Sequence, residues 1–223
     1  MQHELAFLHT SPVHVAGFEA LVQEMAPGLK VHHQVAPSLL ASAQQLGAAH
    51  TTVVKDVESA MQEAAASGAR LVVCTCSSIG GVAEHMSVHT GFQTARIDRA
   101  MADYAVILGP RILLVAALET TLLPTTELLM ESAHALGKPV SISNLLVSDA
   151  WAYFLQGDSD AYLQAISTAV RNQMHKHAAD IDVIVLAQAS MAAAALALAD
   201  VGKQVLSSPR LGVARAISFL QQG

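Results

Sequence analysis

Two apolar runs that end in small polar residues recur at matching places in the two halves of the chain. The first, Val72–Ile79, reads VVCTCSSI, and the second, Ile184–Met191, reads IVLAQASM. Each has the near-continuous apolar pattern of a strand covered on both faces, and a helical pattern follows each. Because βα units resemble one another, a chance match is the alternative. The constant offset between the two runs and the shared order of elements favour an internal duplication.

The rest of the chain alternates in the same way between apolar runs and helical patterns. The first half predicts strands in ELAFLHT (4–10), at the start of KVHHQVAPSLL (30–40) and in ARLVVCT (69–75). It also predicts a helix from 15 that Pro27 and Gly28 stop, and a helix from 51 that Gly68 closes. The second half predicts strand, helix and strand over 110–143, a long helix over 160–180, a strand over 181–190 and a helix over 191–202. We therefore expect an α/β protein with two pseudo-symmetric halves, mostly parallel sheets and an interdomain cleft. The expected halves are residues 1–97, on which a helix over 209–222 can pack back, and residues 98–208.

Composition excludes several classes of protein. The chain is 52% hydrophobic and 13% charged, so it can bury a sizeable core and is not expected to be disordered. A net charge of −6, no basic run and 4% aromatic residues argue against nucleic acid as a partner. No apolar stretch is long enough for a membrane helix, so no membrane partner is expected. The start MQHELAFLHTSP lacks the pattern of a signal peptide, and two cysteines suggest reduced thiols, so a cytoplasmic location is expected.

Small polar residues follow the main predicted strands. They form four turns: His9-Thr10-Ser11, Cys76-Ser77-Ser78, Glu119-Thr120-Thr121 and Gln188-Ala189-Ser190. Sites in open parallel sheets lie beyond the carboxyl ends of the strands. We therefore expect the turns of both halves to line one cleft.

At these residues the sequence resembles the aspartate/glutamate/hydantoin racemase superfamily, which includes arylmalonate decarboxylases and maleate isomerases. VVCTCSS is similar to its first cysteine motif, with Cys76 in the catalytic position, and LETTLLPT to its threonine-bearing turn. VIVLAQASM is similar to the second cysteine motif, but Gln188 stands where the second cysteine would be. The resemblance implies two α/β domains around the site, no cofactor, a small carboxylate-bearing substrate and a role in amino acid metabolism. The superfamily often forms dimers, and a weakly charged, Ala-rich surface would allow a homodimer.

The missing second cysteine changes the expected chemistry. The superfamily's racemases place one thiol on each side of the substrate carbon, whereas Gln188 cannot exchange protons near neutral pH. The superfamily's one-cysteine decarboxylases keep their cysteine in the second motif, opposite to this chain. We therefore expect a racemase- or isomerase-like enzyme that uses Cys76 as acid/base or nucleophile at a carbon next to a carboxylate. The alternatives are a one-thiol decarboxylase-like enzyme and a non-catalytic carboxylate-binding protein on the same fold.

Cys76 and Ser190 are the candidate catalytic residues. Cys76 lies where a strand gives way to a helix, and the unpaired N–H groups of a helix start would lower the pKa of its thiol. The alternative is a small core residue, as we expect for Cys74. Ser190 is a candidate proton donor through a water molecule.

Substrate-binding candidates come from the same four turns. They are His9, Ser11, Ser77, Ser78, Thr120, Thr121 and Gln188. The serines and threonines would hold a carboxylate, or else act only as helix N-caps. Gln188 would bind a substrate carbonyl or amide, or else satisfy buried backbone groups, and His9 could also be structural. Cys74, Cys76, His85 and His89 have the spacing of a zinc site, but a helix would carry the histidines about 10–15 Å from the strand end, so no metal site is predicted.

Overall fold

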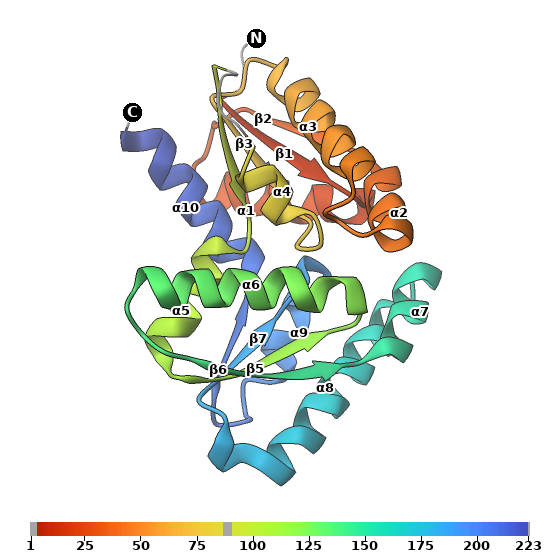
Figure 1. The fold of residues 1–223 in the computed structure, drawn as a ribbon, viewed down its shortest axis with the longest axis vertical. Coiled ribbons are helices and arrows are strands. Elements are labelled where there is room, and N and C mark those ends of the chain that lie inside the picture. Colours follow the sequence, from red (N-terminus) through yellow and green to blue (C-terminus); the bar gives the residue numbers. More distant parts are fainter. Residues whose placement is uncertain (1–3, 87–90, 223) are drawn as a thin grey trace. The chain divides into compact units, whose positions relative to one another are not determined.

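The computed structural model of the protein describes residues 4–86 and 91–222 and divides into two compact units (Figure 1). Unit 1 comprises Met1–Asp98 and Pro209–Gly223, and unit 2 comprises Arg99–Ser208. Each unit is built on its own four-stranded parallel sheet. The predicted α/β class with two halves and parallel sheets is confirmed, and the cleft between the halves stays a prediction.

Unit 1 contains a sheet with the strand order β2-β1-β3-β4. Its strands are β1 (Leu5–His9), β2 (Val31–Val35), β3 (Leu71–Cys74) and β4 (Gln93–Arg96). Its helices are η1 (Pro12–His14), α1 (Val15–Met25), α2 (Pro37–Leu46), α3 (Thr51–Ala65), α4 (Gly80–Glu84) and α10 (Ser208–Gln222). The carboxyl ends of β1 and β3 are therefore direct neighbours in the middle of the sheet.

The two faces of this sheet are covered by different helices. Leu8 and Cys74 belong to a core that α2, α3 and α4 complete. Phe7 points to the opposite face because side chains alternate along a strand, and its ring lies 5.1 Å from that of Phe18 on α1. The last helix, α10, joins this unit so closely that a Cβ on Gly212 would lie 2.2 Å from the Ile97 carbonyl oxygen. A glycine is therefore required where α10 crosses the end of β4.

Unit 2 repeats the strand order of unit 1, as β6-β5-β7-β8. Its strands are β5 (Arg111–Ala116), β6 (Ser141–Leu146), β7 (Val183–Leu186) and β8 (Gln204–Ser207). Its helices are α5 (Arg99–Leu108), α6 (Glu119–Ala135), α7 (Ser148–Gln156), α8 (Ser159–His177), η2 (Ala178–Asp180), η3 (Ala189–Met191) and α9 (Ala192–Ala197). Strands β3 and β7 keep the offset of the sequence repeat at both of their ends, which supports the duplication.

The core of unit 2 is layered like that of unit 1. Leu113 and Val115 of β5 face α7, α8 and α9, where Ile166 and Val170 are fully buried. Helices α5 and α6 contact each other and the strands β7 and β5. Helices therefore cover both faces of this sheet. Functional side chains can then gather only beyond the carboxyl ends of the strands, at β5 and β7.

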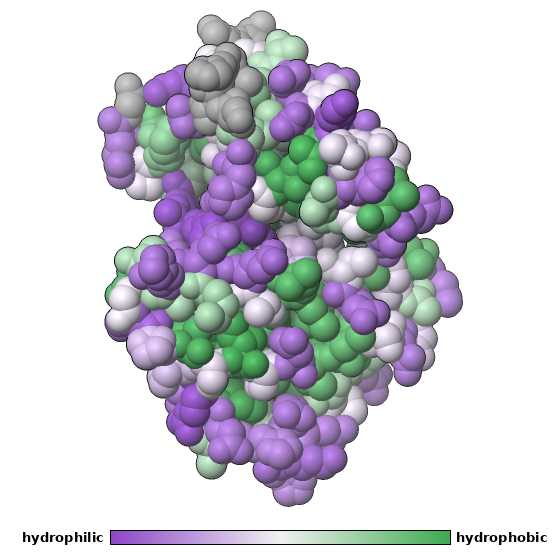
Figure 2. All heavy atoms as spheres, in the orientation of Figure 1, coloured by the Kyte–Doolittle hydropathy of each residue, from purple (hydrophilic) through white to green (hydrophobic). Residues whose placement is uncertain are grey.

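The surface of unit 2 exposes more large apolar side chains than that of unit 1. Most of the large apolar side chains that are exposed among the described residues belong to unit 2: Tyr104, Ile107, Leu123, Met130, Leu136, Leu146, Tyr153, Leu155 and Leu196. Figure 2 shows green apolar patches on the part of the surface that α6 and its neighbours form. Of the helices in the described ranges, none combines the length and the apolar character that a membrane crossing requires.

Candidate functional site

The thiol of Cys76 lies just beyond the end of β3, at the turn that leads into α4. Cys76 is half-buried, whereas Cys74 is fully buried within the strand. The backbone N–H groups of Ser78 and Ile79 and the hydroxyl of Thr10 are hydrogen-bonded to the sulfur of Cys76. Thr10 follows the last residue of β1, so the hydrogen bond joins the ends of the two central strands. The structure therefore surrounds this sulfur with groups that stabilise a negative charge.

Burial nevertheless raises the pKa of the Cys76 thiol above its ordinary value. The hydrogen bonds from Thr10, Ser78 and Ile79 act in the opposite direction and offset part of this increase, while the Asp98 carboxylate adds to it. The prediction that the helix start gives this thiol a lowered pKa is wrong, because loss of water outweighs the N–H donors. Near neutral pH Cys76 therefore carries its proton.

A buried ion pair supports the turn that carries Cys76. The Arg96 Nε donates to Asp98 Oδ1 at 2.6 Å, and Arg96 Nη2 donates to Asp98 Oδ2 at 3.1 Å. The guanidinium also donates to the Ser77 carbonyl at 3.4 Å. A Cβ on Gly80 would lie 3.1 Å from Arg96 Nε, so the glycine lets the guanidinium lie against the start of α4. The Asp98 carboxylate thus fixes this arginine beside the turn.

Ser77 and Ser78 are buried in the same turn, and neither is a helix N-cap. The N-cap residue of α4 is Ile79, and it makes no side-chain capping bond. The alternative role of these serines as N-caps is therefore wrong. The Ser78 N–H contacts Cys76, so the backbone of the turn is directed at the thiol.

His9 and Ser11 flank Thr10 but lie in different environments. His9 has no exposed surface, and its Nδ1 lies 2.9 Å from Thr75 Oγ1. Ser11 caps η1 by accepting a hydrogen bond from the Val13 N–H at 3.5 Å. The structure thus places both expected residues at the end of β1, with His9 on the face of the sheet that α1 covers and Ser11 at the surface turn.

In unit 2, Gln188 occupies the position that corresponds to Cys76. Its Oε1 accepts hydrogen bonds from the backbone N–H groups of Ala117 at 2.6 Å and Leu118 at 3.3 Å. These groups follow the end of β5, and Gln188 is only 8% exposed. Of the two roles expected for Gln188, its oxygen fulfils the structural one. Its Nε2 has no hydrogen-bond partner within the described residues, so the amide hydrogens stay available.

Ser190 and the two threonines of α6 complete the unit 2 candidates. The Ser190 hydroxyl lies 2.8 Å from the hydroxyl of Tyr162, whose pKa burial raises to about 12. A phenol that holds its proton so firmly cannot activate Ser190 as a base. The N-cap of α6 is Leu118 without a side-chain capping bond, so the capping role expected for Thr120 and Thr121 is wrong. Within the described residues the buried Thr120 hydroxyl has no partner.

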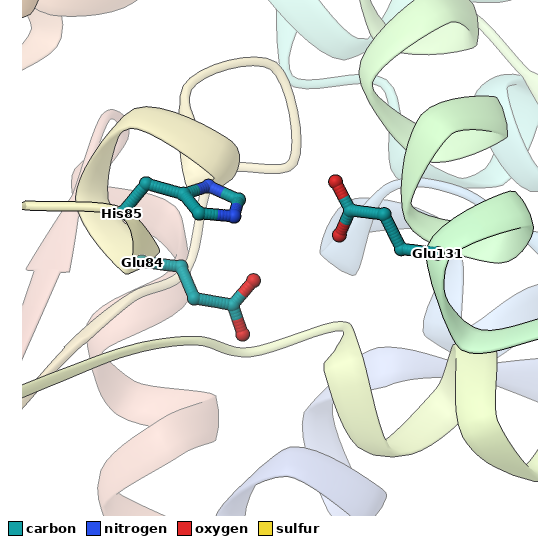
Figure 3. Close-up of side chains that lie close together, drawn as sticks. All are labelled: Glu84, His85 and Glu131. Carbon is teal, nitrogen blue, oxygen red and sulfur yellow. The ribbon is translucent and has the colours of Figure 1, made fainter. Parts of the chain in front are cut away.

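Of the residues considered for a zinc site, the described ones, Cys74, Cys76 and His85, do not form a metal-binding group within unit 1. Helix α4 ends at Glu84, and His85 lies directly beyond it (Figure 3). The Nδ1 of His85 lies 2.8 Å from the Gly81 carbonyl oxygen. His89 lies outside the described residues. Figure 3 also labels Glu131, which belongs to unit 2. In the described parts of each unit taken alone, no three His, Cys, Asp or Glu side chains are close enough to hold a metal ion together.

Sequence reasoning missed three side chains that surround the candidates. Thr10 lies in one of the four turns but is not among the predicted site residues. It follows Leu8 by two residues, as Cys76 follows Cys74, and Leu8 and Cys74 are cross-strand partners. Arg96 ends a short edge strand, and Tyr162 lies in a long helix, so neither pattern points to the site. Of the three, only Thr10 could have been found, from the register of the sheet. That register is known only once the neighbouring strands are known.

Comparison with solved structures shows which proteins share this fold. An aspartate racemase from Picrophilus torridus matches with a TM-score of 0.74 and 11% identity over 99% of this chain and 95% of that chain. A glutamate racemase from Bacillus anthracis matches with a TM-score of 0.69 and 12% identity over 99% and 82%. An allantoin racemase from Pseudomonas fluorescens matches with a TM-score of 0.64 and 16% identity over 100% and 92%. No protein-family model matches the sequence, and no curated protein does.

These matches concern the fold, since all three identities are low. The chain has the two-half α/β fold of the aspartate, glutamate and allantoin racemases. The resemblance inferred from the cysteine motifs is thereby confirmed at the level of the fold.

Proposed function

We propose that this protein is a cofactor-independent, racemase-like isomerase that acts at a carbon next to a carboxylate, with Cys76 as its acid/base group. The observation that carries the proposal is the surroundings of this thiol, which receives the Ser78 and Ile79 N–H groups and the Thr10 hydroxyl at the end of a parallel strand. The racemase fold and the similarity of VVCTCSS to the first cysteine motif support the same assignment.

The substrate in this proposal is a small carboxylate. In unit 1 the candidates to bind it are Ser77 and Ser78, which border the thiol. The candidates of unit 2 are Thr120, Thr121 and Gln188. Thr120 contributes a buried hydroxyl without a partner among the described residues, and an unpaired buried hydroxyl costs about 1–3 kcal/mol that a bound carboxylate would offset. Gln188 would add its Nε2 hydrogens, because its oxygen is already engaged by the backbone.

One thiol limits what such an enzyme can do. A thiolate can take a proton from the carbon next to the carboxylate and return it, but only on its own face of the substrate. The amide of Gln188 cannot exchange protons near neutral pH, and Tyr162 cannot activate Ser190. We therefore propose isomerisation or proton exchange on one face, in preference to inversion between two thiols.

A one-thiol decarboxylase is the second candidate, and the raised pKa of Cys76 favours it. In this reaction the bond between the carbon and a carboxylate breaks, carbon dioxide leaves, and the electron pair stays on the carbon. The Cys76 thiol then gives its proton to that carbon and becomes a thiolate, which water reprotonates. A thiol that keeps its proton near neutral pH is already in the form that this step needs.

Proton exchange in D2O tests both candidates. The protein is incubated with amino acids, hydantoins, hydroxy acids and substituted malonates, and the α-hydrogen and chirality are followed by NMR and chiral chromatography. Cys76→Ala should abolish the reaction. The matched control is Cys74→Ala, which removes the other thiol from inside β3 and should retain turnover.

The outcomes separate the mechanisms. Exchange or decarboxylation without inversion, lost in Cys76→Ala, supports a one-face enzyme. Exchange with inversion means that a second acid/base group exists outside the position of Gln188. If the protein changes no compound while a carboxylate still binds, it is the non-catalytic binder.

The assembly and location belong to the proposal as well. We propose a cytoplasmic homodimer, for which the exposed apolar side chains of unit 2 offer surface. Sedimentation equilibrium should then give twice the chain mass of 23.3 kDa, and a value equal to that mass contradicts the dimer.

A further inference from the structure

Four side chains of unit 1 that the proposed reaction does not use form a continuous line from the surface to the site. The line begins at Glu19 on α1 and runs through His33 on β2 and His9 on β1 to Thr75, the residue before Cys76. Glu19 Oε2 lies 3.1 Å from His33 Nε2, His33 Nδ1 lies 2.8 Å from His9 Nε2, and His9 Nδ1 lies 2.9 Å from Thr75 Oγ1. The Glu19 side chain is 45% exposed and that of His33 12%, while His9 and Thr75 are buried.

The positions of the hydrogens follow from what each group can donate or accept. The Thr75 hydroxyl can donate to the Leu8 carbonyl, 3.1 Å away. If it does, His9 Nδ1 must donate to Thr75, and His9 Nε2 must accept from His33 Nδ1. A carboxylate only accepts, so His33 Nε2 must also carry a hydrogen and donate to Glu19. In this arrangement His33 is a cation paired with Glu19.

Removal of one proton reverses the whole line. His33 then keeps the hydrogen on Nε2 for Glu19, and its Nδ1 accepts from His9 Nε2. His9 Nδ1 in turn accepts from Thr75, whose hydroxyl must turn away from Leu8. The Leu8 carbonyl retains only the Thr75 N–H at 2.9 Å. Uptake or loss of a single proton therefore switches the tautomer of His9 and the direction of the Thr75 hydroxyl.

The surroundings hold the rings in place for this exchange. The rings of His9 and His33 stack with centroids 5.1 Å apart, and the Phe18 ring meets His9 edge-on at 5.3 Å. Burial lowers the pKa of His9 to about 3, and the charges of His33 and of His14, at the start of α1, add to the effect. His9 thus stays neutral, and it responds to the protonation of His33 only by changing its tautomer.

The outer end of the line is suited to receive the proton. The second carboxylate oxygen of Glu19 accepts a hydrogen bond from Gln23 Nε2 at 3.1 Å. Both oxygens of Glu19 therefore act as hydrogen-bond acceptors, so Glu19 can accept the hydrogen that His33 Nε2 carries. Besides Glu19, His33 and His9 themselves, the charge of His14, the last residue of η1, acts on this region.

We propose that Glu19, His33, His9 and Thr75 form a proton relay that binds one proton near the surface and transmits its presence to the strand end beside Cys76. The paired part of β1 and β3 ends at Leu8 and Cys74. Directly beyond it, His9 contacts Thr75 and Thr10 contacts Cys76 through their side chains. The relay thereby sets the hydrogen bonding of the pair that adjoins the thiol. Its proton binding requires no substrate, so it goes beyond the proposed function and does not depend on it.

Imidazole nitrogen NMR tests the relay on the intact protein. Long-range ¹⁵N–¹H correlation spectra of histidine-labelled protein distinguish the two neutral tautomers and the cation, and they are recorded between about pH 5 and about pH 8. We expect His33 to lose its proton in the same step in which His9 changes from the Nδ1–H to the Nε2–H tautomer. A His9 that keeps one tautomer, or that changes at a different pH from His33, overturns the relay.

Variants at the outer end sharpen the test. Glu19→Gln removes the charge that holds the proton, so the joint step should move to lower pH. The matched control is Glu24→Gln on the same helix, whose carboxylate pairs with Arg210 instead and should leave the step unchanged. If both variants shift the pH of the joint change equally, the summed negative charge of α1 holds the proton, and the relay assignment fails.

Discussion

The ends of β3 and β7 occupy the same place in two sheets of identical strand order, yet they are stabilised in opposite ways. In unit 1 the ionisable thiol of Cys76 receives donors from its own turn and from Thr10 at the end of β1. In unit 2 the corresponding Gln188 reaches back to the end of β5 and accepts the N–H groups of Ala117 and Leu118. One unit keeps a group that can exchange a proton, and the other uses an amide that cannot.

This difference shows how duplicated units can divide their tasks. Both strand ends connect the two central strands of their sheet, so both need a polar link at that point. A thiol makes a weak link and leaves the turn to be supported by Arg96 and Asp98. The amide makes a strong link by itself, and removal of each residue should therefore have very different consequences.

The largest effect is expected from Gln188→Ala. Two N–H groups at the start of α6 lose their acceptor, so the free energy of unfolding of unit 2 should fall by about 3 kcal/mol. Denaturant unfolding measures the loss, and hydrogen exchange should show faster exchange of the Ala117 and Leu118 amides. Gln164→Ala, an exposed position in α8, is the matched control and should change stability by less than about 0.5 kcal/mol. Equal losses in both variants would show that Gln188 is not the link between β5 and β7.

Unit 1 should be the more sensitive of the two to acid. The pKa of His9 falls from 6.5 to about 3 on folding, so the unfolded chain binds this proton more readily than the folded one. The stability that neutral His9 provides is complete above about pH 6.5 and is lost as the pH falls toward 3, by about 2 kcal/mol at about pH 5. Hydrogen exchange of the β1 amides as a function of pH measures this loss.

A pair of variants isolates that histidine. His9→Gln should flatten the acid dependence of unit 1, whereas His175→Gln, at an exposed position in α8, should leave it in place. If the stability of unit 1 still falls in acid in His9→Gln, the loss comes from the carboxylates or from another histidine of the unit.

The smallest effect concerns the hydroxyl pair of unit 2. Tyr162→Phe and Ser190→Ala each remove one partner of the same hydrogen bond, so a double-mutant cycle should give a coupling energy of about 1 kcal/mol in the free energy of unfolding. A coupling near zero would free Ser190 for a role at the reacting carbon. The strand end of unit 2 would then also carry a group that is available for proton exchange, as that of unit 1 does.

The fold follows from the sequence where the strands are buried and apolar. Leu71–Cys74 and Val183–Leu186 are covered on both faces, so their apolar runs are unmistakable. The edge strands Gln93–Arg96 and Gln204–Ser207 are short and contain polar residues, so no sequence pattern predicts them. Helix α2 (Pro37–Leu46) was not predicted either, because it is short and begins almost directly after the strand β2.

The candidate site was predictable in position but not in chemistry. Because a strand end is visible in the sequence, the turn that carries Cys76 could be found. Its partner Thr10 comes from the other end of the unit's first segment, so only the register of the folded sheet brings the two together. The direction of the thiol's pKa shift depends on how much water the packing removes, and no local pattern encodes that quantity.

The close contact of Gly212 with the Ile97 carbonyl has a consequence for how the protein is made. Unit 2 is one uninterrupted segment, whereas unit 1 needs both Met1–Asp98 and Pro209–Gly223, which the ribosome supplies only after the whole of unit 2. The usual order, in which the N-terminal domain folds first during translation, cannot be completed here. The nascent chain must wait with an uncovered apolar face on unit 1 while unit 2 is synthesised, and a chain truncated before Pro209 would keep that face exposed to chaperones and proteases.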